Sequence, residues 1–529
     1  MFTFAVLIGL YSYSIFLLGL FHLLYPVYLG VLTLLFVSMT LFLFKNVKLR
    51  LPIHSLLENK FCMFIFVLIL LQLSVNLIGV LGPEISFDSL WYHLPLPRIF
   101  LLKHAIFHIP GNLFYYSDMP KNVEMIYITA LSFGTEIMAK LIHFSFGVLV
   151  AVIIYKFVRR YLDVKFSLLA SLIFVSNLVF GWESITAYVD LGRTFFELLA
   201  LYYFLDWTKD KSNKSLYKSS IMLGFAIATK LIALVSLPIL LSLILYVSLI
   251  DKIPKLRIGK YLVRFFIISI LIPTPWFIFS YVNTGDPFYP FLSLLKLPTG
   301  NLFSLSYFIN SFKELFIYSQ DPINPIYFIL IPVFLIYFSK FEKHFKIIAT
   351  YCFLSLVGWY FTPKLGGGRF ILPYLPAFSI LAAYQIHKVK STFLARYLIM
   401  LIILFSLISI FYRGIANYKF APVVFGAETK QQFLIDRLNF KFGDFYDTDN
   451  YFKNNIHKED VVLLYGFHNL YYVNFPFIDS SFVKKGDSFN YIATQWAALP
   501  TRFSKWQLIY YNQLTGVKLY SNGGAMWAY

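Results

Sequence analysis

Charged residues are scarce in this sequence. Only 13% of its 529 residues are Asp, Glu, Lys or Arg, against about 25% in an average soluble domain. Cysteine is scarcer still: Cys62 and Cys352 are the only two, and both lie within apolar runs, so neither a disulfide framework nor a CxxC-type metal site is available. Walker A, HExxH and GxSxG motifs are missing, which removes P-loop ATPases, zincins and α/β-hydrolases at the level of local motif. The composition excludes a soluble enzyme.

Long apolar runs take the place of charge. Hydrophobic residues make up 59% of the chain and aromatic residues 20%. Runs of about 18 or more apolar residues, each able to cross a hydrocarbon core of about 30 Å, recur from the first residues to position 412. They predict an all-α polytopic membrane protein with about 13 transmembrane helices. The predicted spans are 2–22, 27–44, 61–82, 137–158, 166–182, 189–207, 217–232, 234–250, 262–281, 326–339, 346–361, 370–387 and 395–412.

Two of these spans decide the predicted topology. The spans 217–232 and 234–250 share one apolar stretch that is broken near Lys230 and Pro238, which predicts tilted or half-length helices. If they formed one helix, the sidedness of every later loop would reverse. The first span, 2–22, has no basic n-region and no small-residue cleavage site, so we interpret it as a retained helix.

The net charge of +19 follows the predicted topology. With the N-terminus in the cytoplasm, the inside loops are rich in Lys and Arg, whereas the short outside turns at 183–189 and 362–369 carry only Lys364 and Arg369. This positive-inside asymmetry accounts for most of the excess charge and removes nucleic acid as a partner. It predicts a multi-pass protein of the plasma membrane, surrounded by membrane lipids, with outer loops at 83–136 and 282–325.

The chain is expected to divide near position 412. Residues 1–412 form the predicted transmembrane domain, and residues 413–529, which lose the apolar runs, form a small extracytoplasmic α/β domain. Its aromatic residues could stack on the sugar rings of an acceptor, although most aromatic residues of a small domain lie in its core. A helix at 428–438 and strands at 461–465, 471–475 and 508–511 are expected in it.

The first outer loop begins with GPEISFDSLWYHLPLPR (82–98). Asp88 at the membrane surface could deprotonate an acceptor hydroxyl while His93 or Arg98 addresses a phosphate. The alternative is that Asp88 only caps the helix that starts at Ser89, a role that Asp fills well. Composition alone favours the cap.

The second outer turn leads into a helix with ionisable residues on one face. Asp190, Arg193 and Glu197 fall at i, i+3 and i+7, and such groups at membrane depth normally face a cavity or a partner. They either form a self-contained ladder, or Asp190 also reaches the outer cavity. Lys230, at the outer end of a short span, either pairs with Asp190 or an anionic lipid phosphate, or snorkels to the headgroups.

The last outer turn reads PKLGGGRFILPYLP (363–376). Three glycines before Arg369 combine an exposed backbone, a helix N-terminus and a fixed cation, the features that bind a phosphate or pyrophosphate group. Lys364 supplies a further cation in the same turn. Because any tight hairpin between spans also needs glycine, the prediction of a phosphate site depends on Arg369.

Five segments, taken together and in order, resemble the GT-C superfamily of integral membrane glycosyltransferases. This clan includes protein O-mannosyltransferases and lipid A aminoarabinose transferases. The similarity covers roughly residues 60 to 390, with a weaker match at DVVLLYG (460–466). The five segments are FDSLWYHLPLPR (87–98), AYVD (187–190), ATK (228–230), GDPFYPF (285–291) and GRFILPYLP (368–376).

The resemblance implies a polyprenyl-phosphate-linked sugar donor, an outer-face cavity and a catalytic acidic residue in the first outer loop. Asp88 matches that catalytic residue. Arg369 matches an outer arginine before an LP-type motif, which implies contact with the donor phosphate, and His93 matches a YHLP variant. Ser89 follows Asp88 where other members have a second acidic residue, so neither metal dependence nor a second acidic role for Glu84 is carried over.

These features predict a membrane glycosyltransferase that inverts the sugar configuration. It moves a hexosyl or pentosyl group from a polyprenyl-phosphate donor to a lipid, glycan or protein acceptor at the extracytoplasmic face. Fixed cations are needed where charge develops on the departing phosphate. The residues expected to bind the donor or its phosphate are Arg369, Lys230, Arg98, His93, Asp190 and Lys364.

Three questions stay open on the sequence. A divalent cation such as Mg²⁺ or Mn²⁺ would need hard oxygen ligands, with Glu84 and Asp88 as the candidates. A lipid or glycan transporter or flippase would also be polytopic, but it usually shows inverted repeats or broken helices around a midplane site, and no internal symmetry is detected. A non-catalytic subunit of a glycan-assembly complex is the other alternative.

Overall fold

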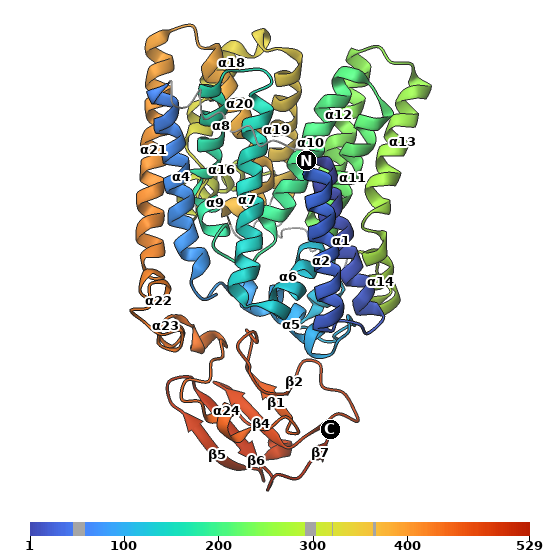
Figure 1. Cartoon of the computed structure of the whole chain (residues 1–529), viewed down its shortest axis with the longest axis vertical. Coiled ribbons are helices and arrows are strands. Elements are labelled where there is room, and N and C mark those ends of the chain that lie inside the picture. Colours follow the sequence, from blue (N-terminus) through green and yellow to red (C-terminus); the bar gives the residue numbers. More distant parts are fainter. Residues whose placement is uncertain (46–58, 291–302, 320, 363–366) are drawn as a thin grey trace.

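A bundle of upright helices makes up most of the molecule (Figure 1). The structure is a computed structural model, and it describes residues 1–45, 59–290, 303–319, 321–362 and 367–529. Every described strand lies between Val462 and Ala528, in a small part that sits below one end of the bundle. The mostly helical fold with a small C-terminal sheet domain is therefore confirmed.

The longer helices run up and down the bundle. In chain order they are α1 (Phe2–Leu20), α2 (Pro26–Phe44), α4 (Lys60–Leu81), α7 (Glu136–Val158), α10 (Asp190–Asp210), α11 (Asn213–Thr229), α12 (Ser236–Ile250), α13 (Lys255–Leu271), α19 (Lys343–Phe361), α20 (Leu375–Lys388) and α21 (Thr392–Tyr418).

Shorter helices and helical turns connect them. They are η1 (Ser89–His93), α5 (Pro95–Leu102), η2 (Tyr115–Asp118), α6 (Asn122–Phe133), α8 (Val164–Val175), α9 (Leu178–Glu183), η3 (Leu231–Val235), α14 (Thr274–Thr284), α16 (Leu305–Lys313), η4 (Glu314–Tyr318), α17 (Ile326–Ile329), α18 (Ile331–Tyr337), η5 (Phe338–Lys340), η6 (Gly367–Phe370), η7 (Leu372–Tyr374), α22 (Ala421–Val424), α23 (Lys430–Arg437), η8 (Phe440–Phe442), α24 (Tyr451–Asn455) and η9 (Thr501–Phe503).

The apolar helices have the lengths that a membrane requires. Six helices of the described chain are long and apolar enough to cross a membrane, and a seventh span results if α13 and α14 are counted as one bent pair. Many of their large apolar side chains are exposed on the outside of the bundle, as expected of a surface that faces lipid tails. The total of about 13 spans stays a prediction.

Several predicted spans are interrupted rather than continuous. The predicted span 166–182 is divided at Asn177 into α8 and α9. The predicted span 262–281 bends by 60° between α13 and α14, where Pro273 can donate no backbone hydrogen bond. By contrast, α11 and α12 are separate helices joined by η3, so the assumption of two helices on which the predicted topology depends agrees with the structure.

The segment that follows α4 is hydrogen-bonded to α7 and to the turn before α10. The buried Lys140 of α7 donates hydrogen bonds of 2.8 Å to the carbonyl oxygens of Gly79 and of Gly82, where the end of a helix leaves carbonyl groups without intrahelical partners. The Glu84 carboxylate accepts from two backbone N–H groups of its own turn and, at 2.7 Å, from that of Ala187. The segment that follows, η1, therefore starts from a rigid base.

The C-terminal part contains a five-stranded mixed sheet in the order β2-β1-β4-β6-β5. The central strand β1 is parallel to β2 and to β4, whereas β6 is antiparallel to β4 and β5. A two-stranded pair of β3 and β7 lies beside it. The strands are β1 (Val462–Tyr465), β2 (Phe477–Asp479), β3 (Ser488–Phe489), β4 (Tyr491–Gln495), β5 (Gln507–Asn512), β6 (Val517–Ser521) and β7 (Trp527–Ala528).

The expectations for this part are met in three of four elements. The helix α23 and the strands β1 and β5 lie where they were expected, but the predicted strand at 471–475 is wrong, because that segment forms no ladder. Its two tyrosines bond to the helical bundle instead: the Tyr472 hydroxyl donates to the carbonyl oxygen of Glu84 at 2.8 Å, and the Tyr471 hydroxyl donates to Glu136. The helix α21 continues past the predicted boundary at 412, to Tyr418.

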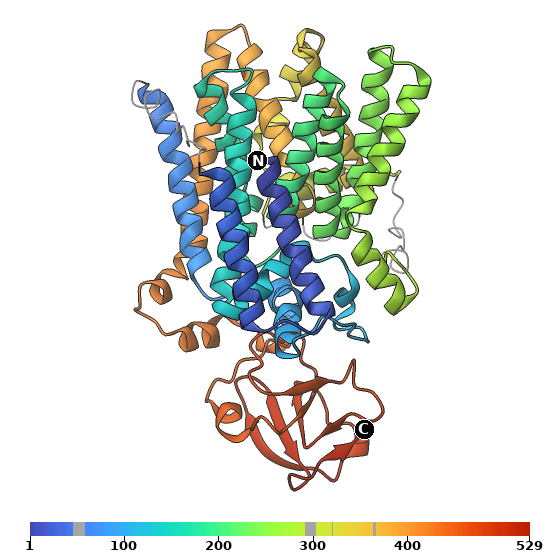
Figure 2. The same ribbon diagram turned by 45° about the vertical axis from the view of Figure 1, so that its right-hand side comes forward.

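The sheet domain meets the bundle at η1. Figure 2 shows the sheet beneath the end of the bundle that carries α5 and α6. The ring of His468, in the loop after β1, stacks on Phe87 at 5.1 Å between centroids and lies 4.7 Å from Trp91. The backbone N–H of Tyr471 donates to the carbonyl oxygen of Leu90 at 3.3 Å. The segment that contains Asp88 thus contacts both the bundle and the sheet domain.

Candidate active site

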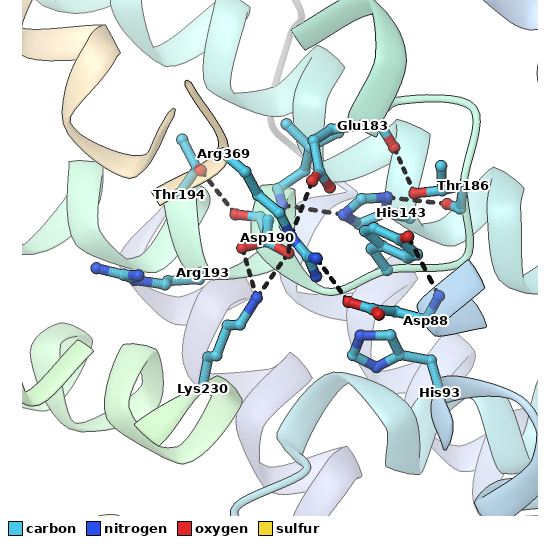
Figure 3. Close-up of polar contacts among 12 residues, drawn as sticks. Asp88, His93, His143, Glu183, Thr186, Asp190, Arg193, Thr194, Lys230 and Arg369 are labelled. Carbon is cyan, nitrogen blue, oxygen red and sulfur yellow. Dashed lines mark hydrogen bonds and ion pairs between the residues drawn. The ribbon is translucent and has the colours of Figure 1, made fainter. Parts of the chain in front are cut away.

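Asp88 lies at the start of the π-helical turn η1. Its carboxylate accepts a hydrogen bond of 2.5 Å from Arg369 Nη1 (Figure 3). It also accepts one of 3.1 Å from the Tyr92 hydroxyl. Its side chain makes no capping hydrogen bond to the turn. The alternative that Asp88 serves only as a helix cap is therefore wrong, because its oxygens point to Arg369 and Tyr92 and not to backbone N–H groups.

Arg369 brings three carboxylates together. In addition to Asp88, its Nε lies 3.1 Å from Asp190 Oδ2 and 3.2 Å from Glu183 Oε1. Its guanidinium lies 4.2 Å from the centre of the Tyr188 ring. Four separate parts of the chain, η1, α9, the start of α10 and η6, therefore meet at one buried cation, which agrees with the rule that buried charges are paired.

Lys230 extends the cluster on its other side. Its Nζ donates to both oxygens of Asp190, at 2.8 and 2.9 Å (Figure 3). Pairing with Asp190 was one of the alternatives that the sequence left open for Lys230. The structure shows this pairing and not a lysine extended to the headgroups, because only 18% of the Lys230 side chain is exposed. We call Asp88, Glu183, Asp190, Lys230 and Arg369 the Asp88 cluster.

The expected ladder on α10 is divided between two partners. Arg193 Nε donates to Glu197 Oε1 at 2.6 Å, and Ser236 Oγ donates to Glu197 Oε2 at 2.7 Å. Asp190 instead pairs with Lys230 and Arg369 from other elements. The helix thus holds its own Arg–Glu pair, while its first residue belongs to the Asp88 cluster.

The neighbouring charges keep Asp88 ionised. Burial alone would raise the pKa of its carboxyl group, but the Arg369 guanidinium, assisted by Lys230, outweighs burial and holds the pKa of Asp88 below its usual range. An ionised carboxylate with a lowered pKa is a good electrostatic partner and a weak proton acceptor.

Several buried polar atoms of the cluster and its surroundings have no hydrogen-bond partner within the described chain, among them Arg369 Nη2, His93 Nε2 and both carboxylate oxygens of Glu183. Buried donors and acceptors are nearly always satisfied, so an unsatisfied one indicates a place where a ligand or water binds. His93 is 2% exposed, and its Nδ1 lies 2.9 Å from Glu124 Oε1. The guanidinium and the imidazole therefore each present one free nitrogen.

Not all predicted site residues join the cluster. Arg98 belongs to the following helix, α5, and donates to the carbonyl oxygen of Tyr471 at the junction with the sheet domain. There it lines two cavities, of 270 and 470 Å³, together with Glu136 and Tyr471. Lys364 lies outside the described residues. Asp88, His93, Asp190, Lys230 and Arg369 are the predicted residues that the structure brings together.

Glu84 and Asp88, the two candidate metal ligands, bind different protein groups. Both oxygens of Glu84 accept backbone N–H groups, whereas Asp88 is paired with Arg369. Within the described ranges, no group of three or more His, Cys, Asp or Glu side chains is placed to hold a metal ion.

Several residues that complete the site were not predicted from the sequence. Glu183 and Tyr188 lie in the second outer turn, and the signal that could have found Glu183 is an ionisable residue at the end of an apolar run. Glu124 lies in the first outer loop and gave no such signal. His143 accepts the backbone N–H of Leu191 at 3.0 Å and so supports the start of α10.

The described chain combines a helical bundle, a small C-terminal sheet domain and a buried cluster of acidic and basic side chains, an architecture that resembles the GT-C superfamily of integral membrane glycosyltransferases. A family model described as dolichyl-phosphate-mannose-protein mannosyltransferase matches residues 108–284. This range contains Asp190 and Lys230 and ends before Arg369. The predicted resemblance to the GT-C superfamily is confirmed.

Two solved structures share the fold. The crystal structure of ArnT from Cupriavidus metallidurans bound to undecaprenyl phosphate superimposes with a TM-score of 0.59 at 14% sequence identity, over 87% of this chain and 98% of that chain. Its apo form gives a TM-score of 0.56 at 13% identity, with the same coverage. A comparison of the sequence with curated proteins gave no match.

Proposed function

We propose that the protein is an inverting membrane glycosyltransferase. In this proposal it transfers a hexosyl or pentosyl group from a polyprenyl-phosphate donor to a lipid, glycan or protein acceptor at the extracytoplasmic face. The Asp88 cluster carries the proposal: two fixed cations, Arg369 and Lys230, lie beside an ionised carboxylate. The undecaprenyl phosphate named for the ArnT crystal structure supports the donor class.

The cations suit a phosphate leaving group. When the bond between the sugar and the phosphate breaks, negative charge develops on the phosphate, and donors fixed in advance stabilise it at little cost of reorganisation. The free Nη2 of Arg369 offers an N–H group for a phosphate oxygen, and a planar guanidinium binds phosphate well. Lys230 adds a second positive charge on the far side of Asp190.

Asp88 is the residue that we assign to the acceptor side. It acts as base or orienter toward the acceptor nucleophile, since it is ionised and held in one place by Arg369 and Tyr92. His93 lies close by (Figure 3). Arg98 and Lys364 have no role in this proposal, because Arg98 is bonded at the domain junction and Lys364 is not among the described residues.

We place the Asp88 cluster and the sheet domain on the extracytoplasmic side of the plasma membrane. The sheet lies at the same end of the bundle as α5 and α6 of the first outer loop. The Lys- and Arg-rich loops belong to the other side by the positive-inside rule. In this proposal residues 1–412 are the transmembrane domain, with about 13 spans and a cytoplasmic N-terminus, and residues 413–529 are the extracytoplasmic domain.

The test uses the full-length protein in nanodiscs with a panel of undecaprenyl-phosphate sugars. We expect the wild type to bind and consume one of them, and Asp88→Asn to bind it without turnover. The matched control is Asp206→Asn, since Asp206 forms a comparable pair with Arg160, at 2.7 Å, near the opposite end of α10. Binding and consumption of no donor by a folded wild type would overturn the proposal.

A transporter or flippase of lipid or glycan is the second candidate. The 60° bend between α13 and α14 is a broken helix of the kind that such proteins use. Movement of a fluorescent polyprenyl-phosphate analogue between leaflets of proteoliposomes, with no sugar transfer, would favour this function. A non-catalytic subunit of a glycan-assembly complex would show neither activity and would tolerate a double substitution of Asp88 and Arg369.

A further inference from the structure

His93 and Glu124 form a buried pair at the edge of the Asp88 cluster. His93 Nδ1 lies 2.9 Å from Glu124 Oε1, and both side chains are at least nine-tenths buried. A carboxylate that accepts the Nδ1–H of a histidine leaves Nε2 with a free lone pair. In this protein Nε2 is buried and has no hydrogen-bond partner within the described chain.

Two tyrosines connect this pair to the cluster. The Tyr92 ring lies 4.2 Å from the His93 ring, centre to centre, and its hydroxyl donates to Asp88. The Tyr188 ring lies 5.5 Å from His93 and 4.2 Å from the Arg369 guanidinium. A single tyrosine therefore links His93 to each of the two charged residues, Tyr92 to Asp88 and Tyr188 to Arg369.

Asp88 alone does not fit the task of a proton acceptor. A general base works best when its pKa lies near the operating pH, and the Arg369 charge holds the pKa of Asp88 below its usual range. A histidine oriented by a carboxylate has the arrangement in which imidazole serves as a general base. Burial lowers the pKa of His93, which keeps the ring neutral, and Glu124 opposes this shift.

We propose that His93 Nε2, oriented by Glu124, takes the proton from the acceptor hydroxyl. This inference rests on the proposed glycosyl transfer and names a further catalytic residue for it. The acceptor oxygen forms a bond to the anomeric carbon while the bond from that carbon to the phosphate oxygen breaks. The electron pair leaves with the polyprenyl phosphate, which Arg369 and Lys230 neutralise, and the proton moves to Nε2 and later to water.

Asp88 then has a different task from His93. Its fixed negative charge, like that of Glu124, stabilises the imidazolium that forms when His93 takes the proton. Other groups around the ring also set its protonation. The titratable groups that face His93 are Glu124 of α6, Asp88 and Tyr92 at η1, Tyr188 before α10, His143 of α7 and Lys230 between α11 and η3.

The experiment is a pH–rate profile of kcat/KM in nanodiscs, with the undecaprenyl-phosphate sugar that the wild type consumes. For the wild type we expect activity to fall as the pH drops through the pKa of His93. His93→Asn should lower the rate by about 100- to 10,000-fold and abolish this acid limb, while donor binding is unchanged. Glu124→Gln should shift the acid limb to lower pH, because removal of the negative charge lowers the pKa of His93.

His108→Asn is the matched control. His108 Nδ1 also lies 2.8 Å from a carboxylate, Asp118 Oδ2, but its side chain is 33% exposed, and we expect a wild-type profile. A rate for His93→Asn within about threefold of the wild type, or an acid limb that survives in it, overturns the proposal even though donor is consumed. If the folded wild type consumes no donor, the proposed function fails and this inference fails with it.

Discussion

Arg369 donates a hydrogen bond of 2.5 Å to Asp88, although 281 positions separate the two residues along the chain. The guanidinium keeps Asp88 ionised and also contacts Asp190 and Glu183. A phosphate that binds to Arg369 competes with these carboxylates for the same cation. In the proposed reaction, Arg369 is thus the shared partner of the donor phosphate and of Asp88 on the acceptor side.

Replacement of Arg369 by lysine should cost activity although the charge is kept. A lysine ammonium has no planar fork, so it cannot contact Asp88, Asp190 and a phosphate at once. We expect kcat to fall by about 10²- to 10³-fold, the typical cost of losing a preorganised donor. The measurement is steady-state turnover of the donor in nanodiscs. Arg160→Lys, at the pair with Asp206, is the control and should retain full activity.

The Asp190–Lys230 pair should behave as a buried ion pair. Lys230→Met leaves the carboxylate of Asp190 with Arg369 as a remaining cation, so we expect a loss in the free energy of unfolding of at most about 3 kcal/mol, the lower end of the cost of breaking a buried pair. Asp190→Asn combined with Lys230→Met removes both charges and should recover part of that loss. Thermal unfolding in nanodiscs measures both variants. A double variant less stable than Lys230→Met alone would contradict the pairing.

The sheet domain should become less stable as the pH rises from 4 to 6. Burial raises the pKa of Asp479 to about 6, although Ser481 opposes the shift through hydrogen bonds. Because the folded pKa lies above the unfolded value, the stabilising contribution is present at low pH and is lost as the pH rises through 6. Asp479→Asn should therefore stabilise the protein at pH 8, by at most about 3 kcal/mol.

This pH dependence is measured as the unfolding temperature of Asp479→Asn relative to the wild type at pH 4.5 and at pH 8. In the wild type, the backbone N–H of Ser481 donates to Asp479 Oδ1 at 2.8 Å. The side-chain oxygen of asparagine can accept the same hydrogen bond. The control is Asp436→Asn on the exposed face of α23, for which we expect the same small difference at both pH values. A gain from Asp479→Asn that is no larger at pH 8 than at pH 4.5 would contradict the assignment.

His468 should influence turnover although it lies in the sheet domain. Its ring packs on Phe87 and Trp91, which flank Asp88 in the sequence. His468→Ala should displace η1 and lower kcat by about 10-fold or more, since small misplacements of reacting groups are costly, while donor binding changes little. Turnover and binding are measured with the same donor. His457→Ala, in the same domain, is the control and should match the wild type.

The sequence predicted most members of the site but not their assembly. Asp190 was predicted because ionisable residues at membrane depth are costly and therefore conspicuous, and Lys230 because it lies at the outer end of a short span. Asp88 and Arg369 were predicted mainly from the resemblance to the GT-C superfamily. No local pattern shows that Arg369 reaches Asp88 rather than solvent, because that contact depends on the packing of distant helices. Arg98 was grouped with them by its place in the same loop, but the start of a new helix, α5, takes it to the domain junction.

For the fold as well, local sequence patterns predicted the helices but not the contacts between distant segments. Runs of apolar residues located the helices, whereas the breaks at Asn177 and Pro273 divide spans that hydropathy joins. The segment 471–475 has the alternation of a strand, but its tyrosines bond to Glu84 and Glu136 of the bundle. Periodicity reports that one face is buried and not which surface covers it.

The long sequence separation between Asp88 and Arg369 has a consequence for biosynthesis. At about 5–20 residues per second, the ribosome needs roughly 14 to 56 s to add the 281 positions between them. During that interval Asp88 is present without its guanidinium partner, whereas Asp190 is followed by Lys230 after only 40 positions. Until η6 has been synthesised, the carboxylate of Asp88 must therefore be protonated, hydrated or in contact with the insertion machinery.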